Sequence, residues 1–135
     1  MSDNEPVGTA PWPKKIFAVT LFTDNLQVSK KFYHEVFDLP VEFEGPTSAV
    51  FDFGNVIINL LVNSSVDEFI SPVKASNSSA GIRQVITVNV DDVDAVCHRL
   101  KAQGVKILAG PMDRPWGPRT ANFADPSGHL WEISS

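Results

Sequence analysis

The apolar residues of the first half of the chain predict a strand followed by a helix. The run from Ile16 to Phe22 is rich in branched and aromatic residues, which is typical of a buried strand. Beyond it, Val28, Phe32 and Val36 recur at intervals of four residues, as on one face of a helix. The preceding Thr23-Asp24-Asn25 offers side chains that cap the start of such a helix.

Proline and glycine then divide the rest of this half into short elements. Pro40 in Asp38-Leu39-Pro40 disfavours a helical conformation at the residue before it, so we expect the helix to end there. Gly45-Pro46 and Gly54-Asn55 separate three apolar stretches that we expect to be strands. These strands are expected at residues 41–43, 48–53 and 56–62.

The same order of patterns returns in the second half. Residues 84–90 predict a strand, and Asp91-Asp92 precedes a helix that carries Val93, Cys97 and Leu100 and that Gly104 closes. Three further strands are expected at residues 105–108, 120–123 and 130–133. Asp91-Asp92-Val93 lies 67 residues after Asp24-Asn25-Leu26, so we interpret the chain as a repeated strand-helix-strand-strand-strand unit.

This repeat gives the expected domain organisation. Residues 1–13 predict a flexible leader, and residues 14–135 a single domain with module one at 14–62 and module two at 82–135. The Ser-rich segment 63–81 between them is expected to be a linker that partly packs.

Composition narrows the class of protein without naming a function. The chain has 135 residues, of which 43% are hydrophobic and 20% charged, as in one globular domain with a core. It has no apolar run long enough for a membrane span and no signal-peptide pattern, and its one cysteine suits a reducing compartment, so we expect a cytoplasmic protein. The net charge of −5 disfavours nucleic acid as a partner and favours neutral or cationic ligands, and we expect no membrane partner because the chain has no long apolar run.

The last strand carries the clearest candidate for chemistry. Asp125-Pro126-Ser127-Gly128 is typical of a turn, and the residues after it alternate between the two faces of a strand. Leu130 and Glu132 share one face, while His129, Trp131 and Ile133 share the other. Glu132 is therefore either a solvated charge or a carboxylate directed into a cavity.

Several stretches resemble the vicinal oxygen chelate superfamily, which includes glyoxalase I, bleomycin-resistance proteins and extradiol dioxygenases. The resemblance rests on residues 17–33, 85–104 and 115–117, and on the closing Phe123-Ala-Asp-Pro-Ser-Gly-His-Leu-Trp-Glu132. It implies an α+β fold in which two βαβββ modules form a half-barrel of eight mostly antiparallel strands around a cleft. It also implies a homodimer.

The resemblance provides a test for a metal site. Metal-using members place ligands on the first and last strands of each module, and these positions correspond here to Ala18, Asn59, Val85 and Glu132. Alanine and valine cannot coordinate a metal, and the amide of Asn59 is a weak neutral donor. A shift of one residue would place Gln84 at the third position, and the set would still lack a ligand near Ala18. We therefore expect no metal and no other cofactor.

The loop from Asp113 to Arg119 has two possible roles. Two prolines and a glycine stiffen it, and it carries Trp116 between Arg114 and Arg119. Trp116 either packs back on the sheet as a core residue or forms an aromatic wall for a planar ligand. Members similar to bleomycin-resistance proteins have a comparable Trp-Gly loop beside their ligand groove.

These observations favour a metal-free protein that resembles bleomycin-resistance proteins and holds a small molecule in the cleft of the half-barrel. The alternative is a metal-dependent lyase or isomerase similar to glyoxalase I, and a purely structural module is a third possibility. We leave open whether the protein is an enzyme or serves antibiotic resistance. The expected ligand-binding residues are Glu132, Asn59, Trp116, Phe22, Phe51, Phe53 and Arg119.

Overall fold

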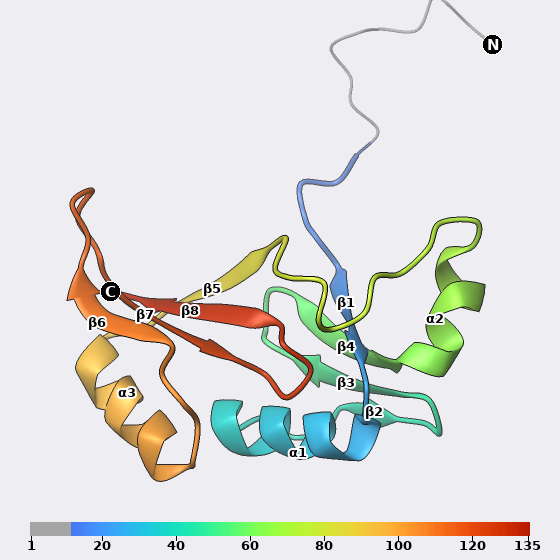
Figure 1. Cartoon of the computed structure of the whole chain (residues 1–135), viewed down its shortest axis with the longest axis horizontal. Coiled ribbons are helices and arrows are strands. Elements are labelled where there is room, and N and C mark those ends of the chain that lie inside the picture. Colours follow the sequence, from blue (N-terminus) through green and yellow to red (C-terminus); the bar gives the residue numbers. More distant parts are fainter. Residues whose placement is uncertain (1–11) are drawn as a thin grey trace, which may run out of the picture.

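The computed structural model describes residues 12–135, and most of the expected leader lies outside this range. Eight strands and three helices follow one another along the chain (Figure 1). The first module contains β1 (Ala18–Thr23), α1 (Leu26–Phe37), β2 (Phe43–Glu44), β3 (Ser48–Asp52) and β4 (Ile57–Val62). After α2 (Asn63–Ile70), the second contains β5 (Val85–Asn89), α3 (Val93–Ala102), β6 (Ala109–Asp113), β7 (Arg119–Ala124) and β8 (Leu130–Ser134).

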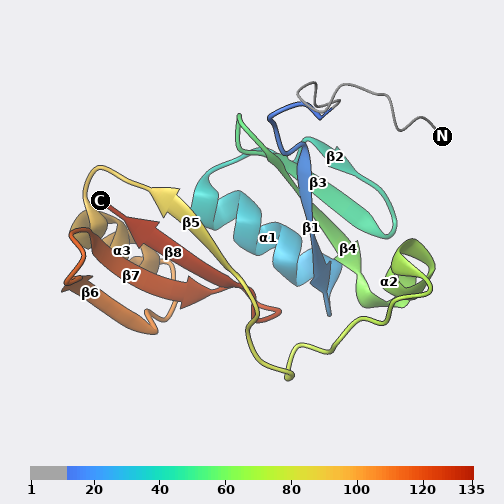
Figure 2. The same ribbon diagram turned by 90° about the horizontal axis from the view of Figure 1, so that it is seen from above.

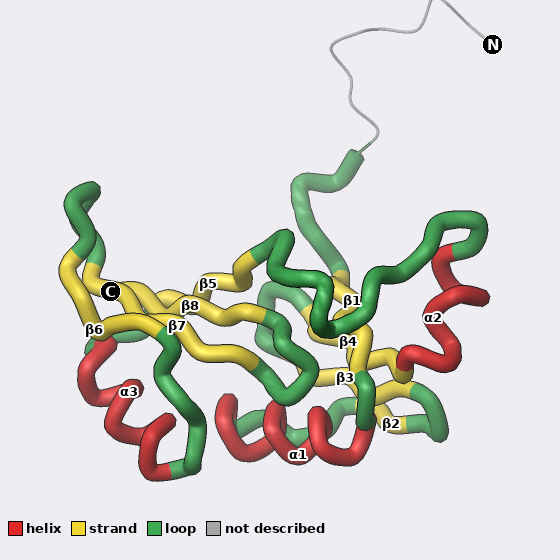
Figure 3. Tube along the Cα trace, viewed as in Figure 1, coloured by secondary structure: helices red, strands yellow, loops and turns green. Residues whose placement is uncertain are grey.

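The strands form two four-stranded sheets with the same topology. The first sheet has the order β1-β4-β3-β2 and the second β5-β8-β7-β6. In each, the first strand pairs in parallel with the last strand of its module, and the other pairs are antiparallel. The expected α+β fold of two βαβββ modules is therefore confirmed, with two open sheets and no closed barrel (Figure 3).

Helix α1 is fixed at both ends by local interactions. Asn25 is its N-cap, and the Asn25 side chain accepts a hydrogen bond from the backbone N–H of Val28. Asp38 ends it in a left-handed conformation with φ of 54°, so the chain turns before Pro40 as the sequence predicted.

The structure differs from the sequence-based expectations in two segments. Residues 63–70 form α2, which the polar composition concealed because only Val66 of this helix is fully buried. The strand expected at residues 105–108 begins later, at Ala109. Val105 and Ile107 pack against the core instead, and the ladder with β7 starts at the hydrogen bond from Leu108 N–H to Asn122 O.

The core lies on the side of the sheets that carries α1 and α3 (Figures 1 and 2). Helix α1 contacts both sheets through its aromatic residues. The ring of Tyr33 lies 5.8 Å from Phe51 in the first sheet and 5.9 Å from Trp131 in the second. The two modules therefore share one core, in which α1 is the common element.

A buried carboxylate lies where the modules join. Asp125 is 5% exposed, and its Oδ2 accepts hydrogen bonds from Tyr33 Oη at 2.5 Å and from His129 Nδ1 at 2.9 Å. Its Oδ1 accepts from the backbone N–H groups of Ser127 and His129. Trp131 Nε1 donates in turn to Tyr33 Oη, at 3.1 Å.

This network determines how Asp125 and Tyr33 ionise. Burial alone would raise the pKa of Asp125, yet the hydrogen bonds from His129 and Tyr33 lower it below its ordinary value. Burial, together with the neighbouring Asp125 carboxylate, raises the pKa of Tyr33 far above its ordinary value. Asp125 is therefore a charged acceptor, and Tyr33 is a neutral donor to it.

No helix among residues 12–135 is long and apolar enough to cross a membrane.

We expect Asp125→Asn to lower the free energy of unfolding by about 2–3 kcal/mol at neutral pH, because a charge-assisted acceptor is lost. The pKa of Asp125 is lower in the folded protein than in the unfolded chain, so its stabilisation is present above the unfolded value of 3.8. It is lost as the pH falls through the lowered folded value. The difference in the free energy of unfolding between the wild type and Asp125→Asn should therefore become smaller as the pH is lowered.

Urea unfolding at neutral and at acidic pH measures this difference. Asp67→Asn, a substitution on the exposed side of α2, is the control for a general effect of removing one carboxylate. A difference between wild type and Asp125→Asn that stays constant with pH would contradict the proposed ionisation.

Candidate functional site

The alternation predicted for the last strand is confirmed. Trp131 and Ile133 are buried on the helix side of the second sheet, whereas Leu130 and Glu132 are half-buried on the opposite side. Neither α1 nor α3 covers that side (Figure 1), and we call it the open face of the sheet. Glu132 lies on this open face.

Glu132 has a hydroxyl partner on the neighbouring strand. Thr87 of β5 lies opposite Glu132 in the parallel ladder, and Thr87 Oγ1 donates a hydrogen bond to Glu132 Oε1 at 2.9 Å. The remaining acceptor positions of this carboxylate are available to a ligand.

The first sheet carries an equivalent pair. Thr20 of β1 lies opposite Asn59 of β4, and Asn59 Nδ2 donates to Thr20 Oγ1 at 3.3 Å. Both side chains are half-buried on the open face of this sheet. Thr20 and Thr87 are 67 residues apart, so the internal repeat relates the two pairs. Sequence reasoning missed both threonines, although this spacing could have revealed them.

A third polar residue extends the row in the second sheet. Asn122 of β7 is the antiparallel partner of Glu132, and its Oδ1 is buried without a hydrogen-bond partner among the described residues. A buried acceptor of this kind requires a donor. Asn122 lies opposite Glu132 in the ladder, so its amide is a further polar group beside this carboxylate.

The residues at the family's metal positions do not fit a metal ion. Ala18 and Val85 pair with Ile57 and Leu130 in the two ladders and have no donor atoms. Asn59 and Glu132 remain, on different sheets. Within residues 12–135, no group of three His, Cys, Asp or Glu side chains could hold a metal ion. The donor set thus disfavours Lewis-acid chemistry.

Two expected ligand contacts lie in the core instead. Phe51 is fully buried against Tyr33, and Phe53 stacks on Trp131 with ring centroids 5.7 Å apart. The expectation that these two residues face a ligand cleft is not supported, because the pleat of β3 directs Phe51 toward α1. Phe22 is half-buried on the side of β1 that carries Thr20, so it remains a candidate contact.

Arg119 also differs from the expectation. Its guanidinium forms two hydrogen bonds with Asp94 of α3, at 2.7 and 3.0 Å, and one with Asp113 at 3.2 Å. These hydrogen bonds raise the pKa of Arg119 and lower that of Asp94. Arg119 therefore links β7 to α3, on the side of the sheet away from Glu132.

Trp116 lies at the tip of the β6–β7 hairpin and is not a core residue. Its side chain is 71% exposed, and the Arg114 guanidinium stacks over its ring at 5.5 Å. Arg114 Nε also donates to Thr120 Oγ1 at 2.8 Å, which fixes the stacked arginine relative to β7. The structure thus decides against burial of Trp116, while its role as a binding wall stays a prediction.

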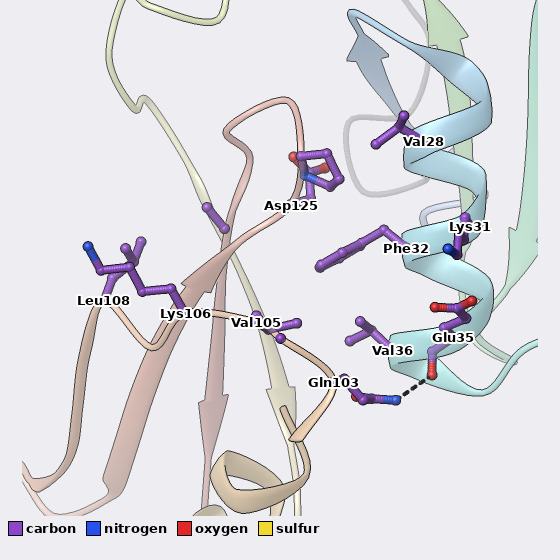
Figure 4. Close-up of a pocket in the computed structure, with 13 residues that line it drawn as sticks. Val28, Lys31, Phe32, Glu35, Val36, Gln103, Val105, Lys106, Leu108 and Asp125 are labelled. Atoms are coloured by element: carbon purple, nitrogen blue, oxygen red, sulfur yellow. Dashed lines mark hydrogen bonds between the residues drawn. The ribbon is translucent and has the colours of Figure 1, made fainter. Parts of the chain in front are cut away.

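Two hollows in the described part of the chain are relevant to binding. One, of about 280 Å³, lies between the end of β1 and the start of β8, and includes Thr20 and Phe22. We call it the junction pocket. The other, of about 370 Å³, lies between α1 and the segment after α3 (Figure 4). Phe32 and Val36 point into it from α1, and Gln103 closes one end by donating to Glu35 O.

Comparison with known proteins places this geometry in a family. Residues 15–133 match the family model of the Glyoxalase/Bleomycin resistance protein/Dioxygenase superfamily. The chain belongs to this superfamily, as its sequence motifs suggested.

Solved structures of similar proteins agree. The chain is 27% identical to a glyoxalase/bleomycin resistance protein/dioxygenase from Nocardioides, with a TM-score of 0.81 over 94% of this chain and 85% of the other. A glyoxalase-related enzyme from Fulvimarina pelagi is 26% identical, with a TM-score of 0.78 over 90% and 88%. A lactoylglutathione lyase from Agrobacterium tumefaciens, 24% identical with a TM-score of 0.72 over 90% and 93%, shares the fold.

We expect Trp116→Ala to change the free energy of unfolding by less than about 0.5 kcal/mol, because its side chain is largely exposed. Phe51→Ala, the comparison in the core, should cost about 3–5 kcal/mol. Urea unfolding of both variants measures the difference. A loss for Trp116→Ala as large as that for Phe51→Ala would mean that the hairpin tip is buried in solution.

Proposed function

We propose that this protein is a small-molecule-binding protein of the bleomycin-resistance-like kind, and that it binds its ligand on the open faces without a metal. The observation that carries this proposal is the polar row Thr87-Glu132-Asn122 on the open face of the second sheet. It combines the half-buried carboxylate of Glu132 with the hydroxyl of Thr87 and the amide of Asn122 on the neighbouring strands. Such a row suits a ligand that offers hydrogen-bond donors.

The surroundings of this row support binding over metal-dependent lyase chemistry. Side chains without donor atoms stand at two of the four metal positions, so a divalent ion would have too few protein ligands to be held and still activate a substrate. The net charge of −5 favours a neutral or cationic ligand. Trp116, exposed at the hairpin tip, would supply an aromatic contact at low entropic cost.

We also propose that the binding protein is a homodimer in the cytoplasm. The open faces carry Val85, which is 46% exposed, and the first sheet begins beside Phe17, which is 79% exposed. Apolar side chains on an uncovered sheet are usually buried by a partner. A second copy could cover both open faces by one symmetric contact and enclose the ligand between them.

We expect Glu132→Gln to weaken ligand binding by about tenfold or more while leaving the melting temperature nearly unchanged, since hydrogen bonds to a charged group contribute about 1.5–3 kcal/mol. A thermal-shift screen of organic compounds on the wild type identifies the ligand, and titration calorimetry measures its affinity. Glu68→Gln on the exposed side of α2 is the matched control.

Elemental analysis of the same protein tests the metal-free state. Bound zinc, nickel or iron at one atom per chain, lost in Glu132→Gln but not in Glu68→Gln, would contradict the proposal and favour the lyase.

Sedimentation equilibrium at micromolar concentration should give the mass of two chains. Val85→Lys should shift the protein toward the monomer, because it places a charge on the open face where the partner would lie. Val73→Lys, at another exposed valine, is the control. A wild type that is monomeric throughout would exclude the dimer.

A further inference from the structure

The junction pocket differs from the open faces in its chemistry. Its lining is mainly polar and comes from the end of β1, the turn before β8 and the connection that precedes β5. Figure 2 shows the course of this connection from α2 to β5. Its volume of about 280 Å³ lies just below the usual range of ligand sites, which begins at about 300 Å³. Neither Glu132 nor Asn59 lines it. A ligand of this pocket would therefore be small and polar.

The residues that line the pocket include one acidic and one basic side chain, and these two do not pair with each other. Asp24 and Arg83 both line it, but no ion pair joins them. The carboxylate of Asp24 accepts a hydrogen bond from Asn63 Nδ2 at 2.5 Å, and no cationic side chain within residues 12–135 forms an ion pair with it. Arg83 forms no ion pair or side-chain hydrogen bond within residues 12–135.

The carboxylate side of the pocket is held in place by the second module. The backbone N–H of Asp24 donates to Ser127 Oγ at 3.0 Å, and Ser127 Oγ also lies 3.2 Å from Thr23 Oγ1. His129 lines the pocket as well, with its Nδ1 fixed by Asp125 at 2.9 Å. These contacts preorganise the position of Asp24, so a ligand would not have to order it.

Apolar side chains also line the pocket. Phe22 and Leu130 line the pocket from the first and the second sheet. A simple cation would leave Arg83 unpaired, and a simple anion would leave Asp24 unpaired. A molecule with both charges on a short carbon framework satisfies both groups at once.

We propose that the junction pocket binds a small zwitterion of the α-amino-acid class. Its ammonium group pairs with Asp24, its carboxylate pairs with Arg83, and its carbon framework contacts Phe22 and Leu130. This site adjoins the open faces, because Thr20, Phe22 and Leu130 line it, but it contains neither Glu132 nor Asn59, and the inference goes beyond the function proposed above.

Titration calorimetry of the full-length wild type with the common L-amino acids, one at a time, tests the proposal. At least one of them should bind in the millimolar range or tighter. Acetate and methylamine each carry only one of the two charges, so both should bind more weakly than that amino acid by a factor of about ten or more. If no amino acid binds, or if acetate or methylamine binds equally well, the zwitterion site is wrong.

Charge-neutral variants locate the site. Asp24→Asn and Arg83→Gln should each weaken binding of the best amino acid by about tenfold or more. Asp67→Asn and Arg99→Gln, which remove the same charges outside the pocket, should bind like the wild type. Equal affinities for the pocket variants and their controls would overturn the assignment. Melting curves verify that each variant is folded, and the two single-charge probes need no variant.

The outcome is independent of the open-face proposal. That function is measured with organic compounds and Glu132→Gln, whereas this one is measured with amino acids and variants of Asp24 and Arg83. If amino acids do not bind, the test of the open-face proposal is unaffected, and a negative result with Glu132→Gln does not affect the test of the zwitterion site.

Discussion

The buried carboxylate of Asp125 is the interaction on which the arrangement of the two modules depends. It lies in the turn before β8, in the second module, yet it accepts a hydrogen bond from Tyr33 on α1 of the first. Both of its oxygens are satisfied, by the backbone of the turn on one side and by Tyr33 and His129 on the other. A buried charge is tolerated only when it is compensated in this way. A shift of α1 against the second sheet would remove the hydrogen bond from Tyr33, the contact to this carboxylate that comes from the first module.

This constraint also determines which faces of the sheets stay open. Because Tyr33 lies between Phe51 and Trp131, α1 occupies the helix side of both sheets at once. The strand period of two then sends every second residue to the opposite face, where Asn59 and Glu132 lie. Side chains alternate between the two faces of each strand. One set forms the core that joins the modules, and the other set forms the candidate site.

Much of the fold could be predicted from the sequence, because its strongest signals are local. The capping residues before α1 and α3 and the alternation in β8 depend on neighbours within a few positions, and the repeat makes each signal visible twice. Helix α2 was missed because Val66 is its main buried residue, so its sequence shows almost no periodic pattern of apolar residues.

The candidate site was predicted less well than the fold. Phe51 and Arg119 were assigned to the cleft because the sequence shows the chemical type of a side chain but not the face of the sheet on which it lies. The pleat of β3 places Phe51 in the core. Arg119 is held on the helix side by Asp94, which is distant in the sequence.

The two modules have the same backbone geometry but carry different side chains at equivalent positions. Thr20 and Thr87 occupy the same place in the two modules, but the first faces a neutral amide and the second a carboxylate. Beside that carboxylate, the partner on the next strand is Asn122, whereas the corresponding partner of Asn59 is Val50. Acceptors are therefore concentrated on the second sheet, and the first is more apolar. A ligand enclosed between a first sheet and a second sheet would meet a neutral wall on one side and an anionic wall on the other. Under the proposed function, that difference would orient a ligand that carries its hydrogen-bond donors at one end.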